Sequence, residues 1–366
     1  MNPPFNQPRT LLRRYLLAGY VLLIAYASLS PFTGWQEQGL DFLAVLISPF
    51  KQTYSWFDAL SNLLAYMPLG LLLGLTLRSK YRTEHSLLLA TLGGVGLSAT
   101  MEYLQMYLPN RTSSNVDLLA NSIGTFAGAM VAIIISSRSW FASMEQWRTS
   151  HFATDGQAEP GLALIFLWMF AQINPSLPML GSVFITAAAH LPFVPTPIEP
   201  FNIWESIAVT LNLAMVGTLL LLLLRSRRHA VGSLFIVLCS VALIKFIAAA
   251  VLLKSSALLL WLNSEAVFGI FVGSILMIAL GWIGRPALIR LAALSAIGYL
   301  ALALWVLDNV PASTAMRLYQ WHFGHLHNYN GLSQKVVLIF PVLMLAYLWR
   351  ISRHRAEVII GTEQEN

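Results

Sequence analysis

Six polar side chains recur at helical spacing within three otherwise apolar stretches of the sequence, and a seventh, an arginine, lies in the short loop between the second and third stretches. They are three carboxylates, three amides and one guanidinium: Asp58, Glu102, Asp117, Asn62, Gln105, Asn121 and Arg111. Asp58 and Asn62 are four residues apart, as are Asp117 and Asn121, so each pair lies on one helix face. Because an ionisable group inside a bilayer is costly, such residues predict either a function or a partner inside the protein.

Two kinds of chemistry fit this set. Arg111 could hold a phosphate or carboxylate through two parallel hydrogen bonds. Three carboxylates are candidate general acids or bases, or acidic groups lining a pocket. The amides are candidate substrate-binding groups. The candidate acid–base residues are Glu102, Asp58 and Asp117, and the candidate binding residues are Arg111, Asn62, Gln105 and Asn121.

A structural interpretation competes with this functional one. Asp117 could cap a helix, Arg111 could pair with Asp117, and the asparagines could bridge helices. Both interpretations remain open from the sequence.

The depth of these residues in a membrane favours a shared pocket. At a rise of about 1.5 Å per residue, Glu102 lies roughly 7 Å inside the outer end of its span, and Asn62 and Asn121 lie about 6 Å below the aspartates. We therefore expect one polar, anion-binding pocket that opens outward. Gly124 and Gly128 continue the stripe of Asn121 inward and predict the close approach of another helix.

The composition indicates the elements that must position these residues. Charged residues make up 10% of the 366 residues, against about 25% in an ordinary soluble domain, and hydrophobic residues make up 57%. These values and the single cysteine exclude a soluble globule, a disordered chain and a disulfide-stapled domain. Apolar blocks of about 20 residues predict an all-α, polytopic transmembrane helical bundle.

Ten apolar segments are predicted spans. They are Leu11–Ser30, Phe57–Leu77, Leu87–Tyr107, Val116–Ser136, Gly161–Asn174, Ile203–Leu224, Val231–Leu253, Ala257–Ile283, Ala287–Leu307 and Val336–Trp349. The connecting loops place 16 Lys and Arg residues on one side and five on the other, so both termini are predicted to be cytoplasmic. Leu177–Leu191, bracketed by prolines, is predicted to be a re-entrant or interfacial element rather than a further span.

The first part of the chain resembles the VanZ-like family of bacterial membrane proteins. The similar region runs from about Leu11 to Arg138. Its motifs are Phe57-Asp58-Ala59-Leu60-Ser61-Asn62, Tyr66-Met67-Pro68-Leu69-Gly70, Glu102-Tyr103-Leu104-Gln105, Arg111, and Asp117-Leu118-Leu119-Ala120-Asn121-Ser122-Ile123-Gly124. The family takes its name from an accessory protein associated with reduced susceptibility to teicoplanin. The resemblance implies a multi-pass protein of the bacterial inner (cytoplasmic) membrane with a role in the cell envelope and a link to glycopeptide antibiotic resistance.

The chain is predicted to comprise two membrane domains, a VanZ-like domain over residues 1–150 and a second helical domain over residues 151–366. The second domain could be a degenerate parallel repeat of the first, because Asp58, Gly70 and Arg78 have the same spacing as Glu205, Gly217 and Arg225. Lys245 is buried in an apolar segment, with Glu265 and Glu205 as candidate partners.

Three functions are compatible with these features. The first is an envelope protein that binds or modifies an anionic lipid-linked or glycan-linked substrate. The second is an ion- or proton-coupled transporter that uses Lys245 and Glu265. The third is a scaffold without catalytic activity. Membrane lipids and a lipid-linked envelope precursor are the expected partners; nucleic acid, a cofactor and a metal are not expected, although His322, His325 and His327 form a loose cluster.

Overall fold

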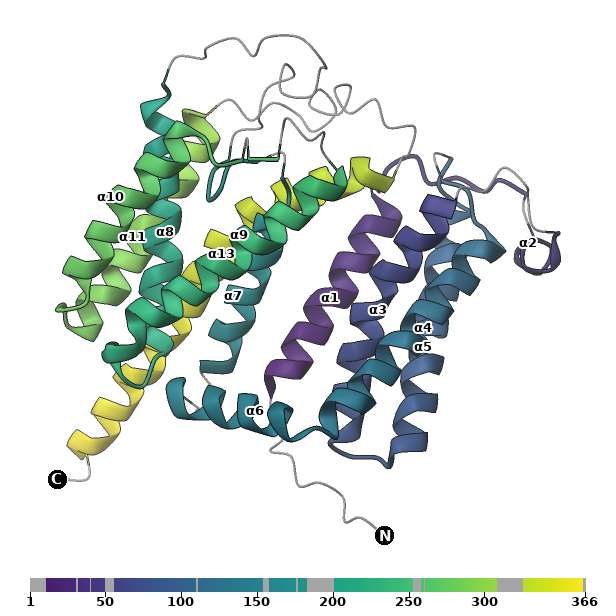
Figure 1. Ribbon diagram of the computed structural model, residues 1–366, viewed down its shortest axis with the longest axis horizontal. Helices are drawn as coiled ribbons and strands as arrows, with labels where there is room; N and C mark the ends of the chain where they lie inside the picture. The colour runs from purple at the N-terminus through teal and green to yellow at the C-terminus, as the bar shows by residue number, and fades with distance from the viewer. Residues whose placement is uncertain are drawn as a thin grey trace. The chain divides into compact units, whose positions relative to one another are not determined.

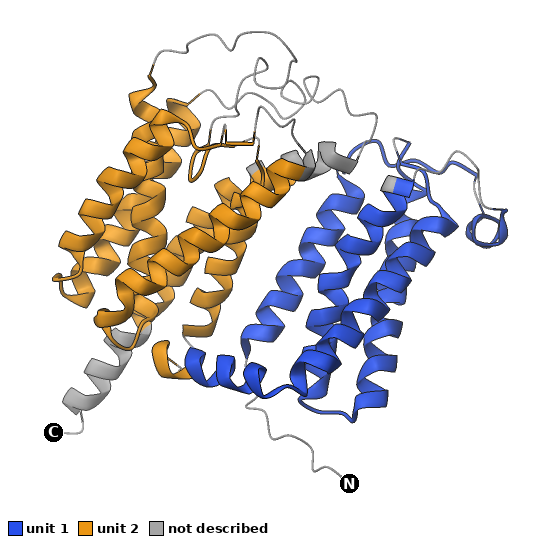
Figure 2. Ribbon diagram, viewed as in Figure 1, with its two compact units in different colours: residues 1–148 blue, residues 149–366 orange. Residues whose placement is uncertain are grey.

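The computed structural model consists of helices joined by turns and loops. It describes residues 11–30, 32–39, 41–49, 56–109, 111–153, 158–175, 177–182, 201–252, 258–259, 261–307 and 325–364. The chain divides into two compact units, residues 1–148 and 149–366 (Figure 2). Within the described residues the regular elements are helical, which confirms the prediction of an all-α bundle.

Unit 1 contains a bundle of four long helices, drawn from purple to teal in Figure 1. These are α1 (Leu11–Leu29), α3 (Trp56–Arg78), α4 (Thr83–Gln105) and α5 (Asn115–Ser136). Two shorter helices accompany them, α2 (Phe42–Ile47) and α6 (Ser139–His151), the second of which ends just past the boundary between the units.

Small residues set the distance between α3 and α5. A Cβ atom on Gly128 would collide with the Met67 carbonyl oxygen, and one on Gly124 would collide with the Leu63 carbonyl oxygen. Conversely, a Cβ atom on Gly70 would collide with the backbone of Thr125. The two helices therefore touch backbone to backbone, as the glycine spacing predicts.

An apolar core in unit 1 lies between α1, α3 and α4. Its buried members are Ile24, Leu29, Tyr66, Leu69, Met101 and Leu108. This core anchors the end of α1 against the ends of α3 and α4 that carry the polar residues.

Unit 2 is organised around α8 (Ile203–Leu223), which is buried over most of its length. Around it pack α7 (Ala158–Gln172), α9 (Ala230–Leu252), α10 (Ser264–Leu280) and α11 (Arg285–Trp305). A 3-10 turn, η2 (Arg227–His229), leads into α9, and α13 (His325–Gln364) packs on α7 and α11.

Each of the ten predicted apolar segments coincides with a helix. Eight helices in the described part of the chain are long and apolar enough to cross a membrane, and α7 and α10, with 15 and 17 residues, are shorter. The chain is thus a multi-pass membrane protein by helix length and composition. The side on which the termini lie stays a prediction.

Two helix starts differ from the predicted ones. α10 begins at Ser264 rather than Ala257, because the Asn263 side chain accepts a hydrogen bond from the Ala266 amide and caps the helix there. α13 begins at His325, 11 residues before the apolar segment, because a helix can continue through polar residues beyond the hydrocarbon.

The predicted re-entrant element is described in part. Residues 177–182 are non-helical and buried, with Leu180 fully buried at a φ of 64°. The rest of Leu177–Leu191 lies outside the described residues. Non-helical backbone inside a membrane protein requires internal partners for its polar groups.

Candidate functional site

The three candidate carboxylates lie in terminal turns at one end of unit 1. Asp58 is in the first turn of α3, Glu102 in the last turn of α4 and Asp117 in the first turn of α5. Because α4 ends where α3 and α5 begin, these turns form one layer. Glu102 and Asp117 are buried, with 4% and 8% of their surface exposed, and Asp58 is half-buried.

Arg111 binds the C-terminal end of α1. Its Nη2 donates to the carbonyl oxygens of Ala27 at 2.9 Å and Ser30 at 3.1 Å. A cation is favourable there because the last carbonyls of a helix lack helical partners and carry partial negative charge. Burial lowers the pKa of Arg111 from its ordinary value, yet a guanidinium stays charged near neutrality. The alternative that Arg111 pairs with Asp117 is wrong, since no ion pair joins these two described residues.

Gln105 binds the same end of α1. Its Nε2 donates to the Ser28 carbonyl oxygen at 3.0 Å. Gln105 and Arg111 therefore hold successive carbonyls of the last turn of α1 against the end of α4.

Glu102 holds the loop that begins α5. Its Oε2 accepts a hydrogen bond from the Ser114 amide at 2.8 Å. Ser114 in turn caps α5 by accepting from the Val116 amide at 3.2 Å. The expectation that Asp117 is the cap is thus wrong, because the hydroxyl three residues earlier takes that role.

Asp117 instead bridges two helices. Its Oδ1 accepts a hydrogen bond from the Asn62 side-chain amide, which joins α5 to α3. Asp58 lies one helical turn outward from Asn62 on α3. The sequence spacing predicted a polar stripe with Asn62 on α3 and another with Asp117 on α5. The hydrogen bond between these two side chains shows that the stripes face each other.

Asn121 bridges α5 to α4 one turn deeper. Its Nδ2 donates to the Ser98 hydroxyl at 2.9 Å. Its Oδ1 is buried and accepts no hydrogen bond in the part of the chain that the structure describes. A buried acceptor without a donor is unusual in a folded protein and marks a position suited to a donor from outside the chain.

Exposed aromatic side chains surround this end of unit 1. Phe32, Trp35 and Tyr103 are each between 44% and 45% exposed, and Phe42 packs edge-to-face on Tyr103 at 5.6 Å. Tyr and Trp collect at the headgroup level of a bilayer. These aromatic side chains are compatible with a polar layer near a membrane surface, which stays a prediction.

Sequence reasoning missed several partners of these residues. Ser114 carried a recognisable signal, since a serine just before an apolar helical stretch is a preferred N-cap. The carbonyl acceptors at Ala27, Ser28 and Ser30 carried none, because any residue type supplies a carbonyl.

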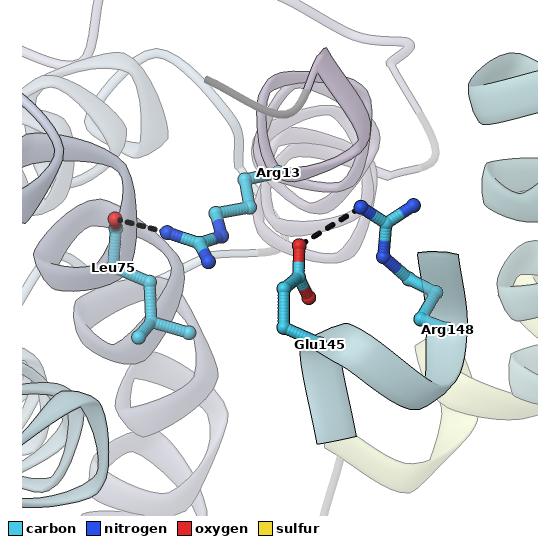
Figure 3. A network of polar contacts seen from close by, with 4 residues as sticks. All are labelled: Arg13, Leu75, Glu145 and Arg148. Atoms are coloured by element: carbon cyan, nitrogen blue, oxygen red, sulfur yellow. Dashed lines mark hydrogen bonds and ion pairs between the residues drawn. The ribbon is translucent and has the colours of Figure 1, made fainter. Parts of the chain in front are cut away.

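The opposite end of unit 1 contains a second arginine bound to a helix end (Figure 3). Arg13 Nη1 donates to the Leu75 carbonyl oxygen at 3.1 Å, in the last turn of α3. Near it, Arg148 and Glu145 form an ion pair at 2.8 Å within α6. This end carries none of the seven candidate residues.

In unit 2, Lys245 binds backbone rather than a carboxylate. Its Nζ donates to the carbonyl oxygen of Gln172, the last residue of α7, at 2.9 Å, and contacts that of Pro178 at 3.5 Å. The expected pairing of Lys245 with Glu265 or Glu205 is therefore wrong, as the described residues include no such ion pair.

The two candidate partners of Lys245, Glu205 and Glu265, also bind backbone. Glu205 accepts from the Ser182 amide at 2.8 Å, and Glu265 accepts from the Asn202 amide at 3.1 Å. Together with Asn212, which donates to the Leu180 carbonyl oxygen at 2.8 Å, Glu205 and Lys245 fix residues 177–182.

The histidine cluster cannot be placed as a group. His322 and Asp308 lie outside the described residues, as do the side chains of His325 and His327. Among the side chains that are described, no three His, Cys, Asp or Glu residues converge as metal ligands would.

Comparison with known proteins gives one match, which lies in the first unit. Residues 14–136 match the family model described as VanZ/LLP1, which covers about a third of the chain. This stretch is therefore a VanZ-like segment, and it holds all seven candidate residues. No curated protein and no solved structure matches the chain.

Proposed function

We propose that the VanZ-like unit binds the anionic headgroup of a lipid-linked or glycan-linked component of the bacterial cell envelope at the outer ends of α3, α4 and α5. The observation that carries this proposal is the hydrogen bonding of Arg111. Both of its bonds to α1 use a single nitrogen, Nη2.

The N–H groups on Nε and Nη1 take no part in those two bonds. Each of them can donate a charge-assisted hydrogen bond to an oxygen of a phosphate or carboxylate. The α1 carbonyls thus orient Arg111, so that little side-chain freedom is lost when an anion binds.

The carboxylates supply the means to modify such a substrate. Glu102 and Asp117 each accept one hydrogen bond that fixes its position, from the Ser114 amide and the Asn62 amide. A fixed carboxylate beside a bound phosphate ester is suited to accept or donate a proton. Asp58, half-buried in the first turn of α3, is the third candidate for this role.

The proposal is tested by Arg111→Lys. An ammonium can still bind the α1 carbonyls as a point charge, but it lacks the further N–H groups that the guanidinium has on Nε and Nη1. We expect the variant to fold and to lose anionic lipid or lipid-linked glycan from the purified protein, as measured by mass spectrometry of the extract.

Arg138→Gln is the matched control, since Arg138 is an exposed arginine just beyond the far end of α5. It should retain the same lipids as the unmodified chain. Equal lipid content in all three proteins would contradict the proposal. A link to glycopeptide susceptibility would follow only if Arg111→Lys also changed teicoplanin susceptibility in cells.

A further inference from the structure

A groove between α8, α9 and α10 of unit 2 has an apolar wall and a basic mouth. Its volume is about 840 Å³. Leu220 of α8, Phe235 of α9 and Met277 of α10 represent its apolar lining. Arg227 and Arg228 line its mouth in the turn that joins α8 to α9, and no acidic residue is among the residues that line it.

The length of the groove matches one leaflet of a bilayer. It follows α9 from Ala230 to Leu238, a rise of about 12 Å at 1.5 Å per residue. Half of a hydrocarbon core is about 15 Å thick. The groove therefore begins at a membrane surface and ends before the midplane, as a site for an acyl chain would.

The mouth is built to receive an anion at that surface. Arg227 Nη1 donates to the carbonyl oxygen of Gly281, the residue that ends α10, at 3.0 Å. This contact holds the guanidinium of Arg227 at the mouth, while the exposed Arg228 adds a second positive charge. Trp282 lies beside the mouth and is 89% exposed. An exposed tryptophan is typical of the headgroup level of a bilayer.

We infer that this groove binds one anionic glycerophospholipid of the adjacent leaflet, with an acyl chain between α8, α9 and α10 and the phosphate on Arg227 and Arg228. The basic mouth above the apolar wall is complementary to a negative headgroup on a hydrocarbon tail, and the length of the groove fits one leaflet. This site is separate from the polar layer of unit 1 and does not depend on the function proposed for that layer.

Two variants test the two parts of the site. Arg228→Gln removes charge from the mouth without touching the Arg227 bond to α10. Ser274→Trp fills the groove, because Ser274 is a half-buried residue of its wall. Arg290→Gln, which removes an exposed arginine outside the groove, and Ser274→Ala are the controls.

The full-length protein is delipidated in detergent and titrated with phosphatidylglycerol or phosphatidylcholine, and bound lipid is counted by native mass spectrometry. We expect one phosphatidylglycerol to bind preferentially, about fivefold weaker in Arg228→Gln and lost in Ser274→Trp. Both controls should match the unmodified chain, and the effects of Arg228→Gln and Ser274→Trp should be the same when Arg111→Lys is also present.

Equal binding of the two lipids, or unchanged binding in Arg228→Gln and Ser274→Trp, would overturn the inference. A protein dimer that Ser274→Trp dissociates, with no lipid bound, would assign the groove to a second copy and would also overturn it.

Discussion

The two units use their buried polar residues differently. In unit 1, two side-chain pairs join neighbouring helices, Asn62 with Asp117 and Asn121 with Ser98. In unit 2, Glu205, Asn212 and Lys245 bind the backbone of residues 177–182. The first arrangement joins regular helices, and the second stabilises an irregular segment that could not otherwise be buried.

The cations follow one rule in both units. Arg13, Arg111, Lys245 and Arg227 each donate to a carbonyl at the C-terminal end of a helix, namely α3, α1, α7 and α10. Such an end carries partial negative charge and unpaired acceptors, so it neutralises a cation without a second ionised side chain. In Arg111 and Arg227, the N–H groups outside these contacts are able to donate to an anion.

The largest effect is expected at the close backbone contact between α3 and α5, which allows side chains of these two helices to form hydrogen bonds with each other. Gly128→Leu places a side chain against the Met67 carbonyl oxygen and should destabilise unit 1 by about 3 kcal/mol or more, through overpacking. Gly96→Leu is the matched control, because nothing lies within 4 Å of a Cβ at that exposed position. Thermal unfolding in detergent measures both. If the two variants melt alike, close backbone contact does not hold α3 to α5.

A smaller effect is expected in unit 2. Lys245→Met keeps the length of the side chain but leaves the carbonyl oxygens of Gln172 and Pro178 without their donor, at a cost of about 1–3 kcal/mol. Hydrogen exchange at residues 177–182 should increase. The exposed Lys335→Met should leave exchange there unchanged. Unchanged exchange in Lys245→Met would show that the lysine does not hold this segment.

The smallest effect is expected at Glu102, where the hydrogen bond from the Ser114 amide can be tested separately from the negative charge. Glu102→Gln retains an oxygen that can accept from the Ser114 amide and should change stability by less than about 0.5 kcal/mol, whereas Glu102→Leu should cost about 1–2 kcal/mol. Melting temperatures of the two variants provide the comparison. A Gln variant as unstable as the Leu variant would mean that the negative charge itself stabilises unit 1.

Sequence reasoning predicted regular features better than irregular ones. The ten helices followed from apolar length, and the Asn62, Asp117 and Asn121 stripe followed from spacing along α3 and α5. The partners of Arg111 and Lys245 did not follow, because they are backbone carbonyls whose position depends on where α1 and α7 end. The sequence suggested carboxylate partners, because a sequence gives side-chain types directly but does not give the positions of backbone carbonyls.

The most direct test of the account measures the affinity of the outer site for a phosphate headgroup. Short-chain dihexanoyl phosphatidic acid is titrated by native mass spectrometry in an Arg228→Gln background, which weakens the groove of unit 2. The account predicts saturable binding that weakens about tenfold or more in Arg111→Lys, since the N–H donors on Nε and Nη1 are lost, with an unchanged melting temperature. Equal affinity with Arg or Lys at position 111 would contradict the claim that the oriented guanidinium recognises the headgroup.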